Sequence, residues 1–332
     1  MRSEPPTKYL YIVGRGHSGT TIFSMLAGEA HAVAMEGEII IGFRPGFEDK
    51  NCANGETFSE SSFWSAVKEA FERRTGTPFA DGVGLLYRRA HCKNVPAMLL
   101  SRSTSAETRE ARRMVEALYD SIAEVSGRPI VLDSTKELAT GIFLLRQVPE
   151  AKLIHFVRSP FGVVDSYVKR MKQAKTFDVF QKRFRVERHY FVPIVIGALL
   201  WTVESFVCEM LRLLYPKRVI TLHYEDLCDQ PIALLEKLER FAGISLAESK
   251  ATARDGAVMP PSHALSGNRL MRTDEIVFSP RKGLPRHLTA LDKAIVTICT
   301  FPMTLAYGYL GRRAIKPAVV IRQATDNAPR PS

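Results

Sequence analysis

Cysteine is scarce in this chain, and its spacing is informative. The 332 residues include only five cysteines, with no CxxC pair and no paired histidines. This pattern excludes a disulfide framework and a cysteine-based structural zinc site, so we expect a reducing compartment and no metal. The first residues also lack the apolar core of a signal peptide, and we therefore expect a cytoplasmic protein. No internal repeat is evident.

Long uncharged apolar runs are equally scarce. Residues 193–215 are rich in Ile, Val and Leu, but the run is interrupted by Glu204, Glu209 and Arg212. A membrane-spanning helix of this length would carry few or no charges. We therefore predict a buried core helix, opened by Pro193.

A second apolar run, residues 294–311, contains 18 residues without a charge and precedes Arg312 and Arg313. Pro302 and Gly308 disfavour this run as a membrane span, and we predict a packed C-terminal helix. Peripheral contact of the run with the inner face of a membrane stays open as an alternative.

The composition is that of an ordinary globular protein with a strong positive charge. Apolar residues make up 45% of the chain, charged residues make up 24%, and the net charge is +11. A chain of this length can hold one large α/β domain or two smaller ones. The charge fits a polyanionic ligand, a nucleic acid or an anionic membrane surface, and does not choose among them.

The stretch Tyr9–Leu26 predicts an anion site. β-prone apolar residues run into the glycine-rich sequence GRGHSGTT (residues 14–21), and apolar residues at helical spacing follow. At such a junction several unpaired amide N–H groups converge, and the helix dipole adds positive potential. The loop also contains hydroxyl and cationic donors: Arg15, His17, Ser18, Thr20 and Thr21. We therefore expect it to bind a phosphate group.

Two known motifs fit the sequence of this loop, and the loop sequence alone does not distinguish between them. Gly14-x-Gly16-x-x-Gly19 matches the dinucleotide fingerprint, with Glu36 and Glu38 near the offset of a ribose-binding acid. The loop also resembles a Walker A sequence in which threonine replaces the lysine, so the clamp on the β- and γ-phosphates is missing. An ordinary NTPase is disfavoured, and an NAD(P)-dependent Rossmann oxidoreductase stays open.

The rest of the chain alternates predicted strands and helices. Strands are predicted at 130–132, 152–157 and 218–223, and helices at 108–125 and 231–241. This alternation predicts an α/β fold with a mostly parallel central sheet of about four to five strands flanked by helices. Ligands of such sheets bind at the carboxyl ends of the strands. We expect one domain over residues 1–316 and a flexible tail over residues 317–332.

A second phosphate site is predicted after the strand at 152–157. Arg158 stands at the strand end, and Ser166 and Arg170 follow on one face of the next helix. Two guanidinium groups and a hydroxyl suit a phosphate group separate from the one in the glycine loop. A 3′-phosphorylated adenine nucleotide, which carries two separated phosphates, needs this arrangement. The alternative is that Arg158 pairs with a carboxylate and Ser166 is a packed helix hydroxyl.

At this point the sequence resembles the sulfotransferases that use 3′-phosphoadenosine 5′-phosphosulfate (PAPS), of the bacterial carbohydrate and tyrosylprotein types. GRGHSGTT is similar to the family's 5′-phosphosulfate loop, and KLIHFVRSPFGVVDSYVKR is similar to its 3′-phosphate motif. The interval of eight residues between the arginine and the serine is also that of the family. VLDSTK, LHYEDL and HALSGNR resemble three further blocks, and all five occur in the family's order.

The resemblance implies a P-loop-like three-layer fold and PAPS as co-substrate, without a metal. It also implies a set of donor-binding residues that contact or cover the nucleotide: Gly16, His17, Ser18, Gly19, Thr20, Thr21, Arg158, Ser166, Arg170, Tyr224, Asn268 and Arg269.

The implied chemistry is in-line transfer of a sulfuryl group to an acceptor hydroxyl or amine. Glu38 corresponds to the family's candidate general base, with Glu36 as its nearest competitor, because a carboxylate must take the acceptor's proton. Lys136 corresponds to a lysine that stabilises charge on the transferring group. The family has arginine or lysine at the position of His17, so either His17 or Arg15 supplies this charge.

The sequence says less about partners. A glycan, a glycolipid and a small alcohol all remain open as acceptors, and the oligomeric state is not indicated. The acceptor site is expected in loops without a chemical signature, around residues 42–62, 75–104 and 171–192. The basic segment Val168–Arg188 leaves a non-catalytic polyanion-binding protein as an alternative. Its phenylalanines follow helical spacing, however, which predicts a core-facing stripe and no nucleic-acid partner.

Overall fold

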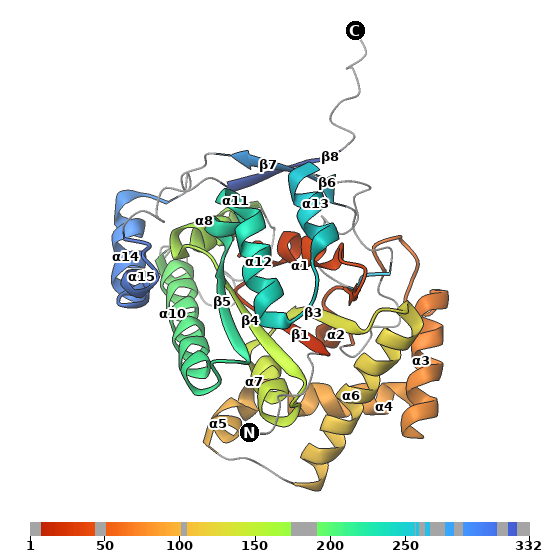
Figure 1. Cartoon of the computed structure of the whole chain (residues 1–332). Coiled ribbons are helices and arrows are strands. Elements are labelled where there is room, and N and C mark those ends of the chain that lie inside the picture. Colours follow the sequence, from red (N-terminus) through yellow and green to blue (C-terminus); the bar gives the residue numbers. More distant parts are fainter. Residues whose placement is uncertain are drawn as a thin grey trace.

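The computed structural model describes residues 8–43, 51–100, 105–173, 191–255, 257–258, 263–265, 276–281, 288–310 and 318–323. Its centre is a sheet of five parallel strands: β1 (Tyr9–Val13), β2 (Val33–Ala34), β3 (Ile130–Lys136), β4 (Ala151–Val157) and β5 (Val219–His223). Their order across the sheet is β2–β3–β1–β4–β5 (Figure 1). The predicted α/β fold with a parallel central sheet is confirmed.

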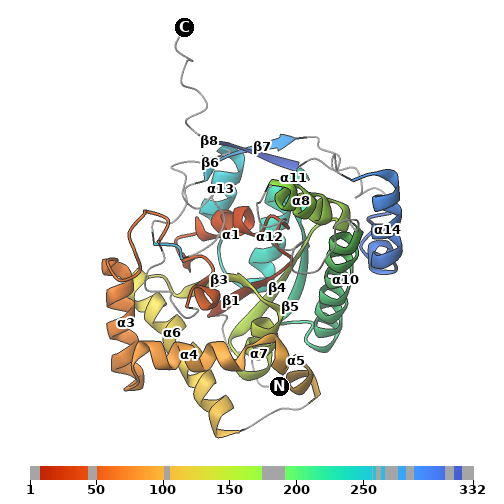
Figure 2. The ribbon, with the colours of Figure 1, turned by 180° about the vertical axis from the view of Figure 1, so that it is seen from behind.

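Helices lie on both sides of this sheet (Figures 1 and 2). Between β1 and β3 they are α1 (Thr20–Gly28), α2 (Ile39–Gly42), α3 (Ser62–Thr75), α4 (Phe79–Arg89), α5 (Val95–Leu100) and α6 (Ala106–Ser126). After β3 they are α7 (Leu138–Gln147), α8 (Pro160–Gln173), α10 (Phe191–Leu214), α11 (Tyr224–Asp229), α12 (Pro231–Ala242), α13 (Ala247–Asp255), α14 (Ala290–Thr300) and α15 (Met303–Ala306). Much of the segment 75–104, expected as loop, is helical.

The side chains of β1 alternate between two hydrophobic cores. Tyr9, Tyr11 and Val13 pack with residues of α3, α4, α6 and α7, whereas Leu10 and Ile12 pack with residues of α1 and α12. Strands that are covered on both faces are continuous apolar runs rather than alternating ones. This explains why apolar runs in the sequence were enough to locate the strands.

The strand order bears on the dehydrogenase alternative. In a Rossmann sheet, the strand that follows the first helix lies next to the first strand. Here β2 pairs with β3, and β3 separates β2 from β1. β2, the strand before Glu36 and Glu38, is therefore one position further from β1 than the strand that carries a ribose-binding acid. The strand order argues against an NAD(P) site.

The α10 helix differs from the buried core helix predicted for residues 193–215. Eight of its large apolar side chains are exposed, so α10 is a half-buried surface helix. By length and composition Val192–Leu214 could cross a membrane, and only 39% of its most apolar window is buried. The described part of the chain contains one helix of this kind.

The C-terminal part also differs in detail from the prediction. Instead of one helix, the run at residues 294–311 contains the end of α14 and all of α15, with a break at Phe301 and Pro302, and residues 307–310 follow as turns. Further on, β8 (Ala318–Gln323) pairs with β7 (Ile276–Arg281), and β7 pairs with β6 (Ala257–Val258) in a small antiparallel sheet. Six residues of the expected tail thus form a strand, and its other residues lie outside the described ranges.

Candidate functional site

The glycine loop joins β1 to α1 and packs tightly against the sheet. A Cβ atom on Gly14 would lie 2.5 Å from the carbonyl oxygen of Phe156 in β4, so only glycine fits there. The Ser18 N–H donates to the Arg15 carbonyl at 3.1 Å, and His17 has a left-handed φ of 72°. The buried Ser18 hydroxyl has no hydrogen-bond partner among the described residues. A buried hydroxyl left unpaired by the protein fits a loop that binds an anion.

Tyr224, at the start of α11, joins this loop to the second predicted phosphate site. Gly19 has a φ of 84°, and a Cβ atom on it would lie 2.3 Å from Cδ2 of Tyr224. The Arg158 guanidinium lies 4.5 Å from the centroid of the same ring, and its Nη1 donates to the His17 carbonyl at 2.9 Å. The buried ring thus brings the glycine loop and Arg158 together. Its position makes it a support for the loop, and its predicted contact with the nucleotide stays a prediction.

Glu38 and Lys136 form an ion pair beside the loop. Lys136 ends β3, has a left-handed φ of 72°, and pairs in register with Val13. Its carbonyl accepts a hydrogen bond from the Gly14 N–H at 3.5 Å. The Glu38 and Lys136 side chains are only 16% and 18% exposed. A carboxylate and an ammonium group therefore lie next to the expected anion site.

The turn that carries Glu38 is fixed by the buried Asp133 of β3. Asp133 Oδ1 accepts from the Ile39 N–H at 3.2 Å and from the Thr135 N–H at 2.7 Å, and its Oδ2 accepts from the Tyr119 hydroxyl at 2.8 Å. Burial raises the pKa of Asp133 to about 6, and the hydrogen bonds from Thr135 and Tyr119 oppose the rise. The VLDSTK segment therefore positions Glu38 as well as supplying Lys136.

Glu36, the competing acid, has a different environment. It is buried, and burial raises its pKa to about 7 although the charge of Arg128 opposes the rise. Its Oε2 has no hydrogen-bond partner among the described residues. Glu38, which pairs with Lys136 beside the loop, is better placed to accept a proton from a ligand.

Arg15 faces α10. Its Nη1 lies 3.9 Å from Oε2 of Glu204, whose side chain is 11% exposed. Burial raises the pKa of Glu204 to about 8, and the charge of Arg15 opposes the rise without cancelling it. The Glu204 carboxyl is thus mostly protonated near neutral pH, so it does not neutralise Arg15. The charge of Arg15 is then available to an anion in the loop.

Three residues that hold this site together were not predicted from the sequence. Trp201 and Glu204 project from α10, and the Trp201 Nε1–H donates to the Arg158 carbonyl at 3.0 Å. Glu225, whose pKa is raised by burial, accepts from the Ser159 N–H at 2.9 Å and so links β4 to α11. Glu204 could have been predicted to have a role, because an acidic residue in an apolar run is unusual. Nothing in the sequence distinguishes Trp201 from an ordinary core residue.

The structure describes only some of the other predicted site residues. Thr20 and Thr21 are buried in the first turn of α1, and Ser166 is half-buried on α8, eight residues after Arg158. Three predicted groups lie outside the described part of the structure: the side chain of Arg170, Asn268 and Arg269. Within the described ranges, no three His, Cys, Asp or Glu side chains gather in a way that could hold a metal ion.

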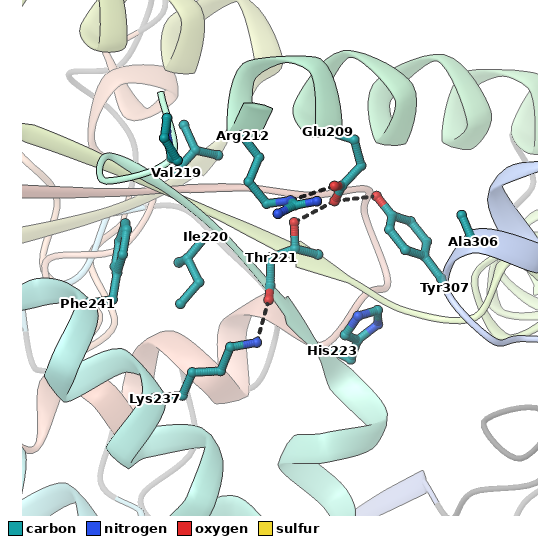
Figure 3. Close-up of a pocket in the computed structure, with 11 residues that line it drawn as sticks. Glu209, Arg212, Val219, Ile220, Thr221, His223, Lys237, Phe241, Ala306 and Tyr307 are labelled. Carbon is teal, nitrogen blue, oxygen red and sulfur yellow. Dashed lines mark hydrogen bonds and ion pairs between the residues drawn. The ribbon is translucent and has the colours of Figure 1, made fainter. Parts of the chain in front are cut away.

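A pocket of about 480 Å³ lies at the outer edge of β5 (Figure 3), and no predicted site residue lines it. Glu209 accepts hydrogen bonds there from Arg212 at 2.6 Å, Thr221 at 2.7 Å and Tyr307 at 3.1 Å. Lys237 donates to the Thr221 carbonyl at 3.1 Å. These polar groups bond to one another, and the pocket is separate from the glycine loop.

Comparison with known proteins gives one family. A model described as the sulfotransferase family matches residues 10–248. Similar solved structures include the sulfotransferase domain of the olefin synthase of Synechococcus PCC 7002, with 14% identity, a TM-score of 0.47, and 93% of this chain and 98% of that chain covered. Another is sulfotransferase STF9 from Mycobacterium avium, with 13% identity, a TM-score of 0.49, and 91% and 77% covered. The comparison with curated proteins gave no match.

The contact between Gly19 and Tyr224 predicts a difference between two glycines of the loop. We expect Gly19→Ala to lower the free energy of unfolding by about 2–4 kcal/mol, because alanine disfavours a positive φ and its Cβ atom would displace the ring. Gly16→Ala is the matched control, since a Cβ atom there meets nothing within 4 Å. We expect it to change stability by less than about 0.5 kcal/mol. Urea denaturation measures both, and equal stabilities of the two variants would contradict the packing argument.

The pairing of Arg15 with Glu204 predicts a pH effect on anion binding. As the pH rises through about 8, Glu204 loses its proton and its charge offsets that of Arg15. Between about pH 7 and pH 9 we expect the wild type to lose about tenfold in affinity for 3′,5′-adenosine bisphosphate, and Glu204→Gln to lose much less. Calorimetric titration at both pH values measures this. Parallel losses in the two proteins would show that Glu204 does not control Arg15.

Proposed function

The chain belongs to the sulfotransferase family, and we propose that it transfers a sulfuryl group from PAPS to an acceptor hydroxyl. The observation that carries the proposal is the convergence of the glycine loop and Arg158 on the ring of Tyr224. Two separate phosphate-binding elements side by side suit a nucleotide with phosphates on both its 3′ and 5′ positions. The acceptor is a carbohydrate, a glycolipid or another small molecule.

The donor would bind through groups of these two elements. The loop amides, with the Ser18, Thr20 and Thr21 hydroxyls and Arg15, would hold the 5′-phosphosulfate, since amides at a helix N-terminus favour an anion. Arg158, with Ser166 and Arg170 from α8, would hold the 3′-phosphate. The unpaired buried hydroxyl of Ser18 and the contact of Tyr224 with Gly19 both support this assignment.

The residues beside the loop would carry the chemistry. PAPS, when bound, supplies the sulfuryl group and leaves as 3′,5′-adenosine bisphosphate. Lys136 and Arg15 would stabilise the negative charge that develops during the transfer, because fixed cations in a partly buried site need little reorganisation. Glu38 would take the proton of the acceptor hydroxyl, and its ion pair with Lys136 orients the carboxylate. Asp133 is a positioning residue, since it fixes the turn that carries Glu38.

The two-phosphate site is tested by binding of 3′,5′-adenosine bisphosphate in EDTA. We expect Arg158→Ala to weaken binding at least about tenfold, because a charge-assisted hydrogen bond to phosphate is lost. Arg240→Ala is the control, since Arg240 is exposed on α12 and its loss changes the net charge equally. Calorimetric titration gives the affinities. Binding of NAD in place of the bisphosphate would contradict the proposal and support the dehydrogenase alternative.

The role of Glu38 is tested separately from donor binding. We expect Glu38→Gln to slow the release of sulfate from PAPS to water by about 10²- to 10⁴-fold, with little change in affinity for the bisphosphate. Water serves here as the acceptor, so the assay does not depend on knowing the natural one. Glu36→Gln is the control and should retain most of the rate. If Glu36→Gln is the slower variant, the base has been assigned to the wrong acid.

A further inference from the structure

Most of the exposed apolar surface of this protein lies in one place. Fourteen large apolar side chains are exposed in the described residues, and thirteen of them belong to α10 or to the segment Leu291–Leu310. Eight lie on α10 between Ile196 and Leu214, and five lie on α14, α15 and their flanks. We refer to these thirteen side chains as the apolar face. Single exposed apolar residues are ordinary on a monomer, whereas a contiguous group of this size marks an interaction site.

The two parts of the apolar face are continuous. On α10 the exposed residues recur every three or four positions, so they share one side of the helix. Helix α14 lies beside α10 in both views of the molecule (Figures 1 and 2). The Thr202 hydroxyl donates to the Cys299 carbonyl at 2.9 Å and joins the two helices. Exposure is high on both, reaching 73% for Leu213 and 76% for Ile298.

The two exposed charged side chains of this region are cations, and one of them, Arg212, is paired with Glu209 at 2.6 Å. Between residues 196 and 214 and between residues 290 and 310, the exposed charged side chains are Arg212 and Lys293. The acids of the same helices are turned inwards: Glu204 and Asp292 are buried, and Glu209 is half-buried. In the sequence, residues 169–188 before α10 contain eight lysines and arginines against two acids. An apolar face whose exposed charged side chains are cationic complements anionic lipid.

This charge pattern favours a bilayer over a second copy of the chain. Each copy carries a net charge of +11, so two copies brought together at this face would repel each other. The inner side of α10 is packed into the protein, with Trp201, Cys208 and Leu211 at 1% exposure or less. Helix α10 therefore cannot cross the membrane while the fold is intact, and it would lie in the plane of the bilayer surface.

We propose that the apolar face docks this protein on the surface of an anionic lipid bilayer. The inner side of α10 contacts Arg15 through Glu204 and the Arg158 carbonyl through Trp201. The donor site is thus one helix, about 10 Å thick, behind the docking surface. An acceptor held in the same bilayer is then the natural substrate class, and this extension rests on the proposed function, whereas the docking itself does not.

The proposal is tested by co-sedimentation of the full chain with sucrose-loaded vesicles. We expect binding to phosphatidylcholine vesicles that contain about 30 mol% phosphatidylglycerol, and weaker binding in about 0.5 M salt. The triple variant Phe206→Ser, Ile298→Ser and Leu305→Ser should bind at least about tenfold more weakly, because three large side chains no longer enter the lipid. All three are exposed, so the variant should keep the wild-type melting temperature and affinity for 3′,5′-adenosine bisphosphate.

The matched control is Lys68→Ser with Glu69→Ser. Both residues are exposed on α3, on the opposite side of the molecule from α14 in Figure 1, and the pair leaves the net charge unchanged. It should bind vesicles like the wild type. Absence of binding, or equal binding by the triple variant, overturns the proposal. A dimer in light scattering that the triple variant abolishes, without vesicle binding, would assign the face to a second copy. Neither absence of vesicle binding nor dimer formation through the apolar face would change the result of the nucleotide titration, so failure of the docking proposal is distinguishable from failure of the proposed function.

Discussion

The contact of Tyr224 with Gly19 is the one on which the proposed donor site depends. The ring touches the glycine loop on one side and carries the Arg158 guanidinium on the other. Loop and guanidinium are joined again by the hydrogen bond from Arg158 to the His17 carbonyl. The ends of three strands, β1, β4 and β5, are therefore held in one rigid arrangement. Such preorganisation matters for a transfer reaction because the cations must already be in place when charge develops.

A second group of buried polar residues surrounds Glu38, the proposed general base. Asp133 has an unfavourable position for a carboxylate, and its raised pKa reflects that cost. The cost is offset by hydrogen bonds that fix the backbone before α2. This backbone segment holds Glu38 next to Lys136. Glu204 is also a buried carboxyl group, but it affects the site through its uncharged form. Burial keeps it largely protonated, which leaves the charge of Arg15 uncompensated near neutral pH. Both carboxyl groups act on the site through their neighbours.

Much of this could be predicted from the sequence, and what could not has a common cause. The strands were predicted correctly, and the glycine loop, Arg158, and Glu38 with Lys136 could be nominated as site residues, because each depends on local spacing or on a contiguous block of residues. The packing of Tyr224 behind the loop, the Trp201 bond to the Arg158 carbonyl and the pairing of Arg15 with Glu204 join segments far apart in the chain. The exposure of α10 was missed for the same reason, since an apolar helix has the same sequence whether its outer side is covered or not. The roles of all the predicted site residues stay predictions, and Asn268, Arg269 and the side chain of Arg170 lie outside the described part of the structure.

The long sequence separation within the site also has a consequence for folding. The hydrogen bond from Arg158 to His17 spans 141 positions of the chain, and Tyr224 lies still further from the loop that it supports. Contacts between such distant segments form late, because closing long loops costs entropy before the contacts stabilise anything. A partly folded chain would hold the glycine loop without its second phosphate site. A nucleotide that needs both would then bind only the complete fold, and each tenfold excess of the nucleotide over its dissociation constant would add about 1.4 kcal/mol to the stability of the native state alone.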